Sequence, residues 1–153
     1  MKKYYLAYGS NLSLLQMSFR CPNAIPVGTA TLKDYELLFK GSSTGNYLTV
    51  EKQEGSSVPL VVWQISEDDE KNLDFYEGFP EFYYKEELEV EAKPFLGEET
   101  INVNAIIYIM HEDRLRGLPS QRYYDTVKEG YERFGFDVNT LNHAVFNSVI
   151  DED

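Results

Sequence analysis

Strand-like segments fill most of the first two-thirds of this 153-residue chain, without helices alternating regularly between them. Runs rich in β-branched and aromatic residues lie at 4–8, 25–32, 35–39, 47–51, 58–65, 83–92 and 102–110. Segments 41–46 and 54–57 have the Gly/Ser-rich composition of turns. Because a parallel sheet needs a crossover, usually a helix, between successive strands, this order disfavours a βαβ fold. It predicts an α+β domain around a curved or closed sheet.

Helix signals are found at 13–19, 66–76, 120–134 and 139–150. Pro22 ends the first helix, since the residue before a proline avoids the helical region. The second opens with a capping box from Ser66 to Asp69, in which aspartate replaces the usual glutamate. Ser120 is the expected N-cap of the third. The helices are therefore few, and two of them lie at the C-terminal end of the chain.

The length of the chain indicates the number of domains, and its charge excludes some classes of binding partner. About 150 residues suffice for one domain, and we expect a single domain over 1–150 with an acidic tail at 151–153. The chain carries 14 basic and 26 acidic residues, a net charge of −12, without a Lys/Arg cluster. That balance argues against binding nucleic acid or an anionic membrane surface. The longest apolar runs, such as 106–110, are too short to span a bilayer.

Cysteine and histidine offer little chemistry. The single cysteine, Cys21, excludes an internal disulfide and a Cys-rich zinc site, and a reducing cytoplasmic setting is the simplest expectation. Cys21 is interpreted as a buried, inert thiol. His111 and His143 do not have metal-ligand spacing, and no glycine-rich phosphate loop is present. The sequence thus indicates neither a metal site nor a phosphate site.

A sharp loop is predicted at Tyr8-Gly9-Ser10-Asn11-Leu12, between the first strand and the first helix. In a structural role, Gly9 permits the turn and Ser10 or Asn11 caps the helix. In a functional role, the same turn directs backbone N–H groups at one point, where they can hold a carboxylate or a developing oxyanion. The residues alone leave both roles open.

Glu77 is the candidate acid/base group. Gly78 is a natural residue to follow a helix, which leaves Glu77 at the C-terminal end, where the helix dipole disfavours a carboxylate. Aromatic residues surround it in the sequence. Such an environment raises a carboxyl pKa towards the range of a general base at neutral pH. The alternative is a partly exposed acid in an already acidic helix.

The third candidate segment is 117–124, at the start of the third helix. Tyr123 and Tyr124 are adjacent there, so they point about 100° apart on a helix. One of them can pack in the core while the other faces a pocket.

Together, these three segments resemble the γ-glutamylcyclotransferase-like family. The 8–12 loop is similar to its YGSN signature, and Pro119-Ser120-x-x-Tyr123 is similar to its late PS-x-x-Y element. Leu73-Asp74 followed by Glu77-Gly78, with Tyr84 downstream, resembles its LD-x-x-EG…Y segment. The resemblance spans nearly the whole chain with the motifs in order.

The resemblance implies a single α+β domain, with a mixed β-barrel-like sheet flanked by a few helices and a cavity lined by the YGSN loop. It implies that Glu77 is the acid/base residue. The substrate-binding residues that it implies are Tyr8, Gly9, Ser10, Asn11, Leu12, Tyr84 and Tyr123. Tyr83 is the register alternative to Tyr84.

The implied reaction is cyclisation of a γ-glutamyl amine, amino acid or peptide to 5-oxoproline with release of the amine, without a metal or cofactor. The implied partner is a small γ-glutamyl molecule; the sequence does not identify the amine or the oligomeric state. Two alternatives use the same pocket: hydrolysis or transfer of a γ-glutamyl or related acyl group, and non-catalytic binding of a small carboxylate metabolite. Local donors, or Lys85, Arg20 and Arg122, would have to offset the net charge of −12 for an anionic substrate.

The chain contains 12 tyrosines, and we expect several of them to form the wall of the pocket. The predicted wall is Tyr8, Tyr76, Tyr83, Tyr84, Tyr123 and Tyr124, and the tyrosines predicted to be ordinary core are Tyr108 and Tyr131. A tyrosine wall can bury a glutamate while it leaves hydroxyl groups for a polar substrate.

Overall fold

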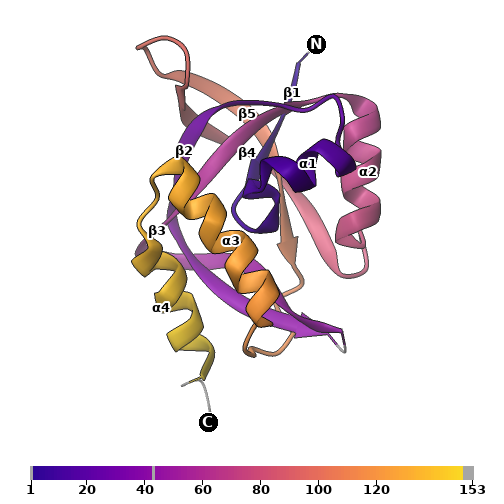
Figure 1. Cartoon of the computed structure of the whole chain (residues 1–153), viewed down its shortest axis with the longest axis vertical. Helices are drawn as coiled ribbons and strands as arrows, with labels where there is room; N and C mark the ends of the chain where they lie inside the picture. Colours follow the sequence, from indigo (N-terminus) through magenta and orange to yellow (C-terminus); the bar gives the residue numbers. More distant parts are fainter. Residues whose placement is uncertain (1, 43, 150–153) are drawn as a thin grey trace.

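Five strands close into a barrel in the computed structural model, which describes residues 2–42 and 44–149 (Figure 1). The strands are β1 (Lys3–Ala7), β2 (Ile25–Ser42), β3 (Gly45–Ile65), β4 (Tyr83–Pro94) and β5 (Ile101–Met110). Their order around the barrel is β1-β3-β2-β4-β5. The β1–β5 pair is parallel and the other pairs are antiparallel. The predicted α+β class with a mixed, closed sheet is confirmed.

Two pairs of predicted strands are single long strands. β2 has 18 residues and β3 has 21, so the turn predicted at 54–57 and the break predicted after 32 are wrong. The register shifts between Lys33 and Tyr35. Near this irregularity Asp34 and Gly55 have φ values of 66° and 89°, and the Gly55 N–H donates to Asp34 Oδ1 at 3.0 Å. A β-bulge accommodates turn-type residues and bends the strand without ending it, which suits strands that wrap a barrel.

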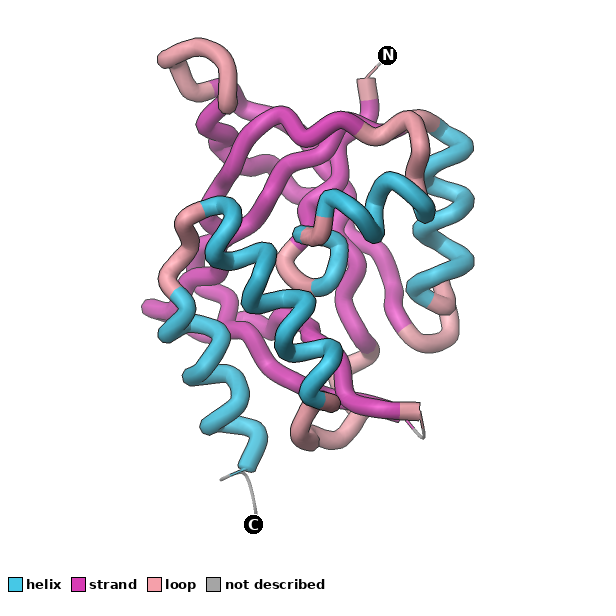
Figure 2. The backbone as a smooth tube through the Cα atoms, in the orientation of Figure 1, coloured by secondary structure: helices cyan, strands magenta, loops and turns pink. Residues whose placement is uncertain are grey.

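In the described part of the chain, four α-helices and one 3-10 turn lie outside the barrel (Figure 2). They are η1 (Ser10–Leu12), α1 (Leu14–Arg20), α2 (Glu67–Glu77), α3 (Gln121–Phe134) and α4 (Val138–Val149). Ser66 and Asp69 form the predicted capping box, and Ser120 accepts from the Tyr123 N–H as the predicted N-cap. Each helix begins within about two residues of its predicted position. In α1, α2 and α3 a serine side chain caps the first turn, and this signal is local.

Packing of the helices on the barrel places the loop at 8–12. α3 packs against η1, α1 packs against α2, and α4 packs against β2. Leu12 and Tyr131 are fully buried where α3 meets the rest of the molecule. The core itself fills the barrel and continues under α2 and α3. The 8–12 loop is therefore held between the end of β1 and the buried face of α3.

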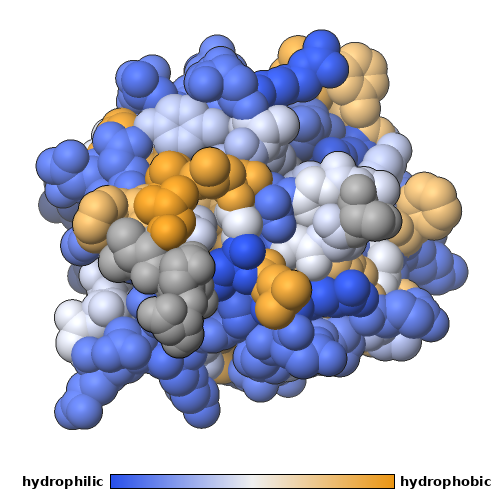
Figure 3. Space-filling model, turned by 90° about the horizontal axis from the view of Figure 1, so that it is seen from below, coloured by the Kyte–Doolittle hydropathy of each residue, from blue (hydrophilic) through white to orange (hydrophobic). Residues whose placement is uncertain are grey.

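The face of the molecule drawn in Figure 3 is mostly hydrophilic. Seen from the end that carries the C-terminal part of α4, apolar residues lie in small groups among polar ones (Figure 3). Within residues 2–42 and 44–149, no helix has both the length and the apolar character needed to cross a membrane. The acidic tail predicted at 151–153 lies outside the described residues.

Candidate active site

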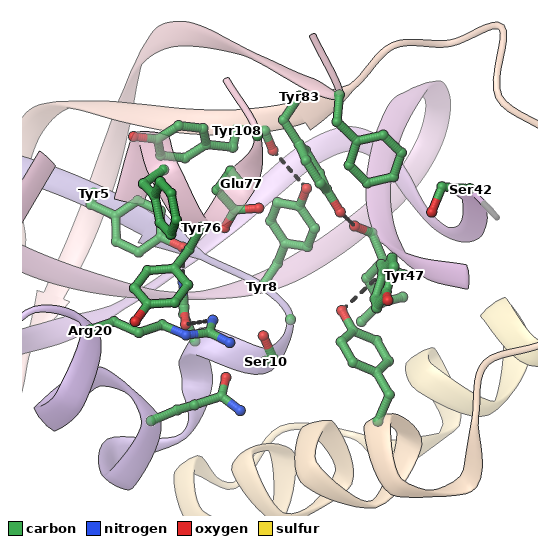
Figure 4. A pocket seen from close by; sticks show the side chains of 18 of the residues that line it. Tyr5, Tyr8, Ser10, Arg20, Ser42, Tyr47, Tyr76, Glu77, Tyr83 and Tyr108 are labelled. Atoms are coloured by element: carbon green, nitrogen blue, oxygen red, sulfur yellow. Dashed lines mark hydrogen bonds between the residues drawn. The ribbon is translucent and has the colours of Figure 1, made fainter. Parts of the chain in front are cut away.

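A cavity of about 530 Å³ opens between the end of β1, α1 and the end of α2 (Figure 4). Strands β3 and β4 and the start of α3 complete its wall. Seven tyrosines line it: Tyr5, Tyr8, Tyr47, Tyr76, Tyr83, Tyr108 and Tyr123. Glu77 is the acidic residue among its lining side chains. The expected cavity with a tyrosine-rich wall around Glu77 is therefore present.

Glu77 is the last residue of α2, and the chain reverses immediately after it. Gly78 adopts the left-handed conformation, with φ 65°, and ends the helix as expected. The Glu77 carboxyl group lies among aromatic side chains (Figure 4). Burial raises its pKa to about 7, although the positive charge of Arg20 opposes this rise. A carboxyl group with this pKa can both accept and donate a proton near neutral pH.

The loop at 8–12 forms a 3-10 turn that begins after Gly9. Ser13 caps α1, because its hydroxyl oxygen accepts from the Gln16 N–H at 3.1 Å. The structural role expected for Ser10 or Asn11, capping this helix, is therefore taken by Ser13. Ser10 and Asn11 line the cavity instead, and the first N–H groups of such a turn have no acceptor within it.

The side chain of Leu12, unlike those of Ser10 and Asn11, points away from the cavity. Its side chain is fully buried against α3, where a Cβ added to Gly130 would lie 2.5 Å from the Leu12 Cβ. It does not line the cavity. The prediction that Leu12 contacts substrate is thus wrong for its side chain, which anchors the loop to α3.

The structure decides between Tyr83 and Tyr84. Tyr83 is 6% exposed and lines the cavity, and its hydroxyl group donates to the Leu48 carbonyl oxygen at 2.8 Å. Tyr84 points to the other face of β4, where its hydroxyl group donates to Glu112 at 2.5 Å. The prediction that Tyr84 lines the cavity is wrong, because adjacent residues of a strand face opposite sides.

Hydroxyl groups of the tyrosine wall are held by the backbone. Tyr8 donates to the Tyr108 carbonyl oxygen at 2.6 Å, and the Tyr123 hydroxyl oxygen accepts from the Leu48 N–H at 3.1 Å. Burial raises the pKa of Tyr8, Tyr83 and Tyr123 above the ordinary value of a phenol, so all three are neutral at neutral pH. Gly9 lies so close that a Cβ there would come within 3.1 Å of the Tyr123 hydroxyl. The wall is thus rigid on this side.

Two other tyrosine predictions are corrected. Tyr108 was expected to be ordinary core, and it is buried, but it also lines the cavity and its hydroxyl group donates to Asp74 at 2.6 Å. Tyr124 hydrogen bonds to Asn142 of α4 and does not line the cavity. Tyr131 is core, as expected.

Arg20 is a cavity residue that has no place in the three sequence motifs. Its Nη1 donates to Asn11 Oδ1 at 2.7 Å, and Asn11 Nδ2 donates to the Tyr5 hydroxyl oxygen at 2.9 Å. Lys85 instead pairs with Glu70 and Asp74, and Arg122 is exposed outside the cavity. The sequence places Arg20 at the end of the helix that follows the 8–12 loop, and this position is the signal that could have marked it as a cavity residue. The position alone does not show where the guanidinium points.

Other nucleophiles and metal ligands are not gathered here. Cys21 is buried, and burial raises the pKa of its thiol to about 12, which keeps it protonated at neutral pH. Across the described residues, no three His, Cys, Asp or Glu side chains are arranged to hold a metal ion. Tyr47 and Leu48, which sequence reasoning missed, enter the wall through the β2–β3 hairpin.

Comparison with known proteins assigns the fold to a family. Residues 5–132 match the family described as gamma-glutamyl cyclotransferase, AIG2-like. The chain belongs to this family. The matched range contains the 8–12 loop, Glu77 and Tyr123, which together surround the cavity.

Individual relatives agree with this assignment. The chain is 36% identical over 81 residues to a gamma-glutamylcyclotransferase from Bos taurus, a match that spans 48% of this chain and 43% of the bovine protein. It is similar to the structure of a gamma-glutamyl cyclotransferase, with TM-score 0.81 and 25% identity over 94% of this chain and 86% of that one. An uncharacterized protein from Homo sapiens has TM-score 0.79 at the same identity and coverage.

Proposed function

We propose that this protein is a γ-glutamyl cyclotransferase that converts a γ-glutamyl amine, amino acid or peptide to 5-oxoproline and releases the amine. The observation that carries the proposal is the Glu77 carboxyl group, whose pKa of about 7 suits a general acid/base and which faces the same cavity as Ser10 and Asn11. Membership of the family supports the reaction type.

The chemistry needs one group that moves a proton in both directions. The Glu77 carboxylate takes a proton from the α-ammonium group, and the free nitrogen attacks the γ-carbonyl carbon of the same molecule. A C–N bond forms, the carbonyl π electrons move to oxygen, and a tetrahedral intermediate results. When the oxygen electrons return, the bond to the leaving nitrogen breaks, and protonated Glu77 supplies one proton to this amine. The ring nitrogen gives up its second proton to the Glu77 carboxylate that this regenerates, and that proton passes to the released amine, which leaves as an ammonium ion. No water is consumed.

The attack is intramolecular, so much of the acceleration comes from folding the glutamyl arm into an attacking shape. A rigid wall such as the one around Tyr8 and Tyr123, whose hydroxyls are held by the backbone, suits that task. The N–H groups at the start of η1 are the candidate donors to the developing oxyanion. Gly9, Ser10 and Asn11 are thus proposed to cradle the reacting group, with Tyr8 and Tyr123 as substrate-binding residues.

The substitution Glu77→Gln tests the proposal. It keeps the shape of the side chain but removes the acid/base function, so 5-oxoproline formation should fall by roughly 10²–10⁴-fold while the fold is kept. The measurement is 5-oxoproline release from a panel of γ-glutamyl amines, amino acids and peptides, with circular dichroism to check folding. Glu81→Gln, at an exposed site four residues later, is the matched control and should retain full activity.

The products separate the proposal from its alternatives. Hydrolysis of the same substrates yields free glutamate, transfer yields a new γ-glutamyl compound, and pure binding yields no product. Mass spectrometry of the reaction mixture distinguishes these results. Parental 5-oxoproline formation by Glu77→Gln, or glutamate as the main product of the wild-type protein, would contradict the proposed role of Glu77 as the acid/base of a cyclisation.

A further inference from the structure

Arg20 is the cationic side chain among the described residues that line the cavity. It extends from the end of α1 to a position beneath Tyr76, on the side of the cavity where Glu77 lies (Figure 4). Its Cζ is 4.8 Å from the centroid of the Tyr76 ring. A guanidinium held against an aromatic face keeps a fixed orientation.

The guanidinium of Arg20 has more N–H donors than its hydrogen bond within the protein uses. One N–H bonds to Asn11 Oδ1 at 2.7 Å, and the remaining side-chain N–H groups donate to no side chain or carbonyl in the described part of the chain. A guanidinium carries five N–H donors in a planar fork that matches a carboxylate. Asn11 therefore fixes one edge of the fork and leaves donors for a ligand.

Gln16 supplies the complementary group one helical turn earlier on α1. Its side chain also lines the cavity, and its Oε1 is buried without a hydrogen-bond partner among the described residues. A buried acceptor without a partner is unusual and favours a site that a ligand completes. The same face of α1 thus presents a cation and an acceptor, which match the carboxylate and the N–H groups of an amino-acid head group.

We propose that Arg20 binds the α-carboxylate of the γ-glutamyl group, while Gln16 accepts a hydrogen bond from its α-nitrogen. This inference rests on the proposed function and deepens it, because it assigns the residues that recognise the α-carboxylate and the α-nitrogen of the substrate. It also explains how a chain with a net charge of −12 can hold a carboxylate: the attraction is local, and the other nearby cation, Lys85, is paired with Glu70 and Asp74.

The test uses 5-oxoproline, the common product of all the proposed substrates, and its neutral isostere 5-oxoprolinamide. Affinities of the wild-type protein for the two compounds are measured by calorimetric titration. We expect the acid to bind at least tenfold more tightly than the amide, because a charge-assisted, two-pronged hydrogen bond is lost in the amide. Arg20→Ala should abolish this preference while it changes the affinity for the amide by less than about threefold.

Two further variants control for loss of structure. Arg122→Ala removes an exposed arginine outside the cavity and should keep the full preference. Arg20→Lys keeps the positive charge but lacks the planar, forked set of donors, so it should retain part of the preference for the acid over the amide. Because the readout is a ratio of two affinities in the same sample, a lower folded fraction does not change it.

The outcomes separate this inference from the proposed function. If the wild-type protein forms 5-oxoproline but Arg20→Ala keeps the wild-type preference for the acid, the inference is wrong and the function stands. An absence of preference in the wild-type protein likewise overturns the inference alone. A wild-type protein that neither forms nor binds 5-oxoproline overturns both.

Discussion

Glu77 combines a position that is unfavourable for a carboxylate with the proposed acid/base function. Its carboxyl group lies at the C-terminal end of α2, where the helix dipole disfavours a negative charge, and it is partly buried among aromatic rings. Both effects oppose ionisation, and Arg20 offsets them only in part. The residue therefore holds its proton more firmly than an ordinary glutamate. The ionised form of Glu77 correspondingly lowers the free energy of unfolding.

This destabilisation by ionised Glu77 should appear in the pH dependence of stability. The Glu77 pKa is about 7 in the folded protein against an ordinary 4.5, so between these values the folded state holds a proton that the unfolded state has lost. Stability from this group is therefore complete below pH 4.5 and falls as pH rises to 7, by at most about 3 kcal/mol. Glu77→Gln should be more stable than wild type at pH 8 and similar to it at pH 4.5.

Urea unfolding of both proteins at several pH values measures the difference. The exposed Glu81→Gln variant should show no such trend. A stability difference between Glu77→Gln and wild type that stays constant from pH 4.5 to pH 8 would show that Glu77 titrates normally.

Among the elements, the helices and the strands differ in how well sequence patterns predict them. Helix ends follow from local chemistry: Ser66, Ser120 and Gly78 act at the positions where their side chains or backbone freedom predicted a helix end. The ends of the strands in this barrel do not follow from local chemistry. Asp34 and Gly55 look like turn residues, yet they lie within continuous strands, because a neighbouring strand in the barrel supplies partners on both sides of the bulge.

The contact of η1 with α3 leaves no room for a side chain at Gly130. Gly130 is buried in α3, and a Cβ there would lie 2.5 Å from the Cβ of Leu12, closer than such atoms can approach. Gly130→Ala should therefore force α3 away from the loop and lower the free energy of unfolding by about 1–3 kcal/mol, although alanine favours a helix.

Thermal and urea unfolding check this prediction. Glu129→Ala, at the adjacent exposed position, makes the matched control and should be neutral or slightly stabilising. Equal stability of Gly130→Ala and wild type would mean that the helix can move away from Leu12 without loss of packing.

At the scale of the whole molecule, the net charge of −12 acts on stability. Like charges repel one another in the compact state, and salt screens them, since the Debye length falls from about 30 Å at 0.01 M to about 8 Å at 0.15 M. We expect the melting temperature at pH 8 to rise by a few degrees over this range of NaCl concentration. The same titration near pH 4.6, the calculated isoelectric point, is the control and should show little change. A rise of equal size at both pH values would assign the effect to something other than net charge.

Much of the cavity could be predicted from the sequence because its motifs are short and contiguous. The 8–12 loop follows a strand and precedes a helix, and Glu77 follows from a helix-stop signal; both depend on neighbours within a few residues. Arg20, Tyr5, Tyr47 and Tyr108 could not be assigned in this way. Tyr5, Tyr47 and Tyr108 reach the cavity from strands whose orientation is set by barrel closure. Arg20 reaches it from α1, which packs against η1 and α2, and no local pattern encodes either arrangement.

The sequence by itself determined the class of fold, the ends of the helices, the resemblance to a family and the acid at the end of α2, because each rests on interactions between near neighbours in the chain. Only the tertiary structure decided that Tyr83 and not Tyr84 faces the cavity, that Leu12 anchors the loop, and that Arg20 and Gln16 line one wall. For the tyrosines the reason is that a shift of one residue in strand register turns a side chain to the opposite face, and register is set by pairing with residues far away in the sequence. For Leu12, Arg20 and Gln16 the reason is the packing of η1 against α3 and of α1 against α2, elements that are far apart in the sequence.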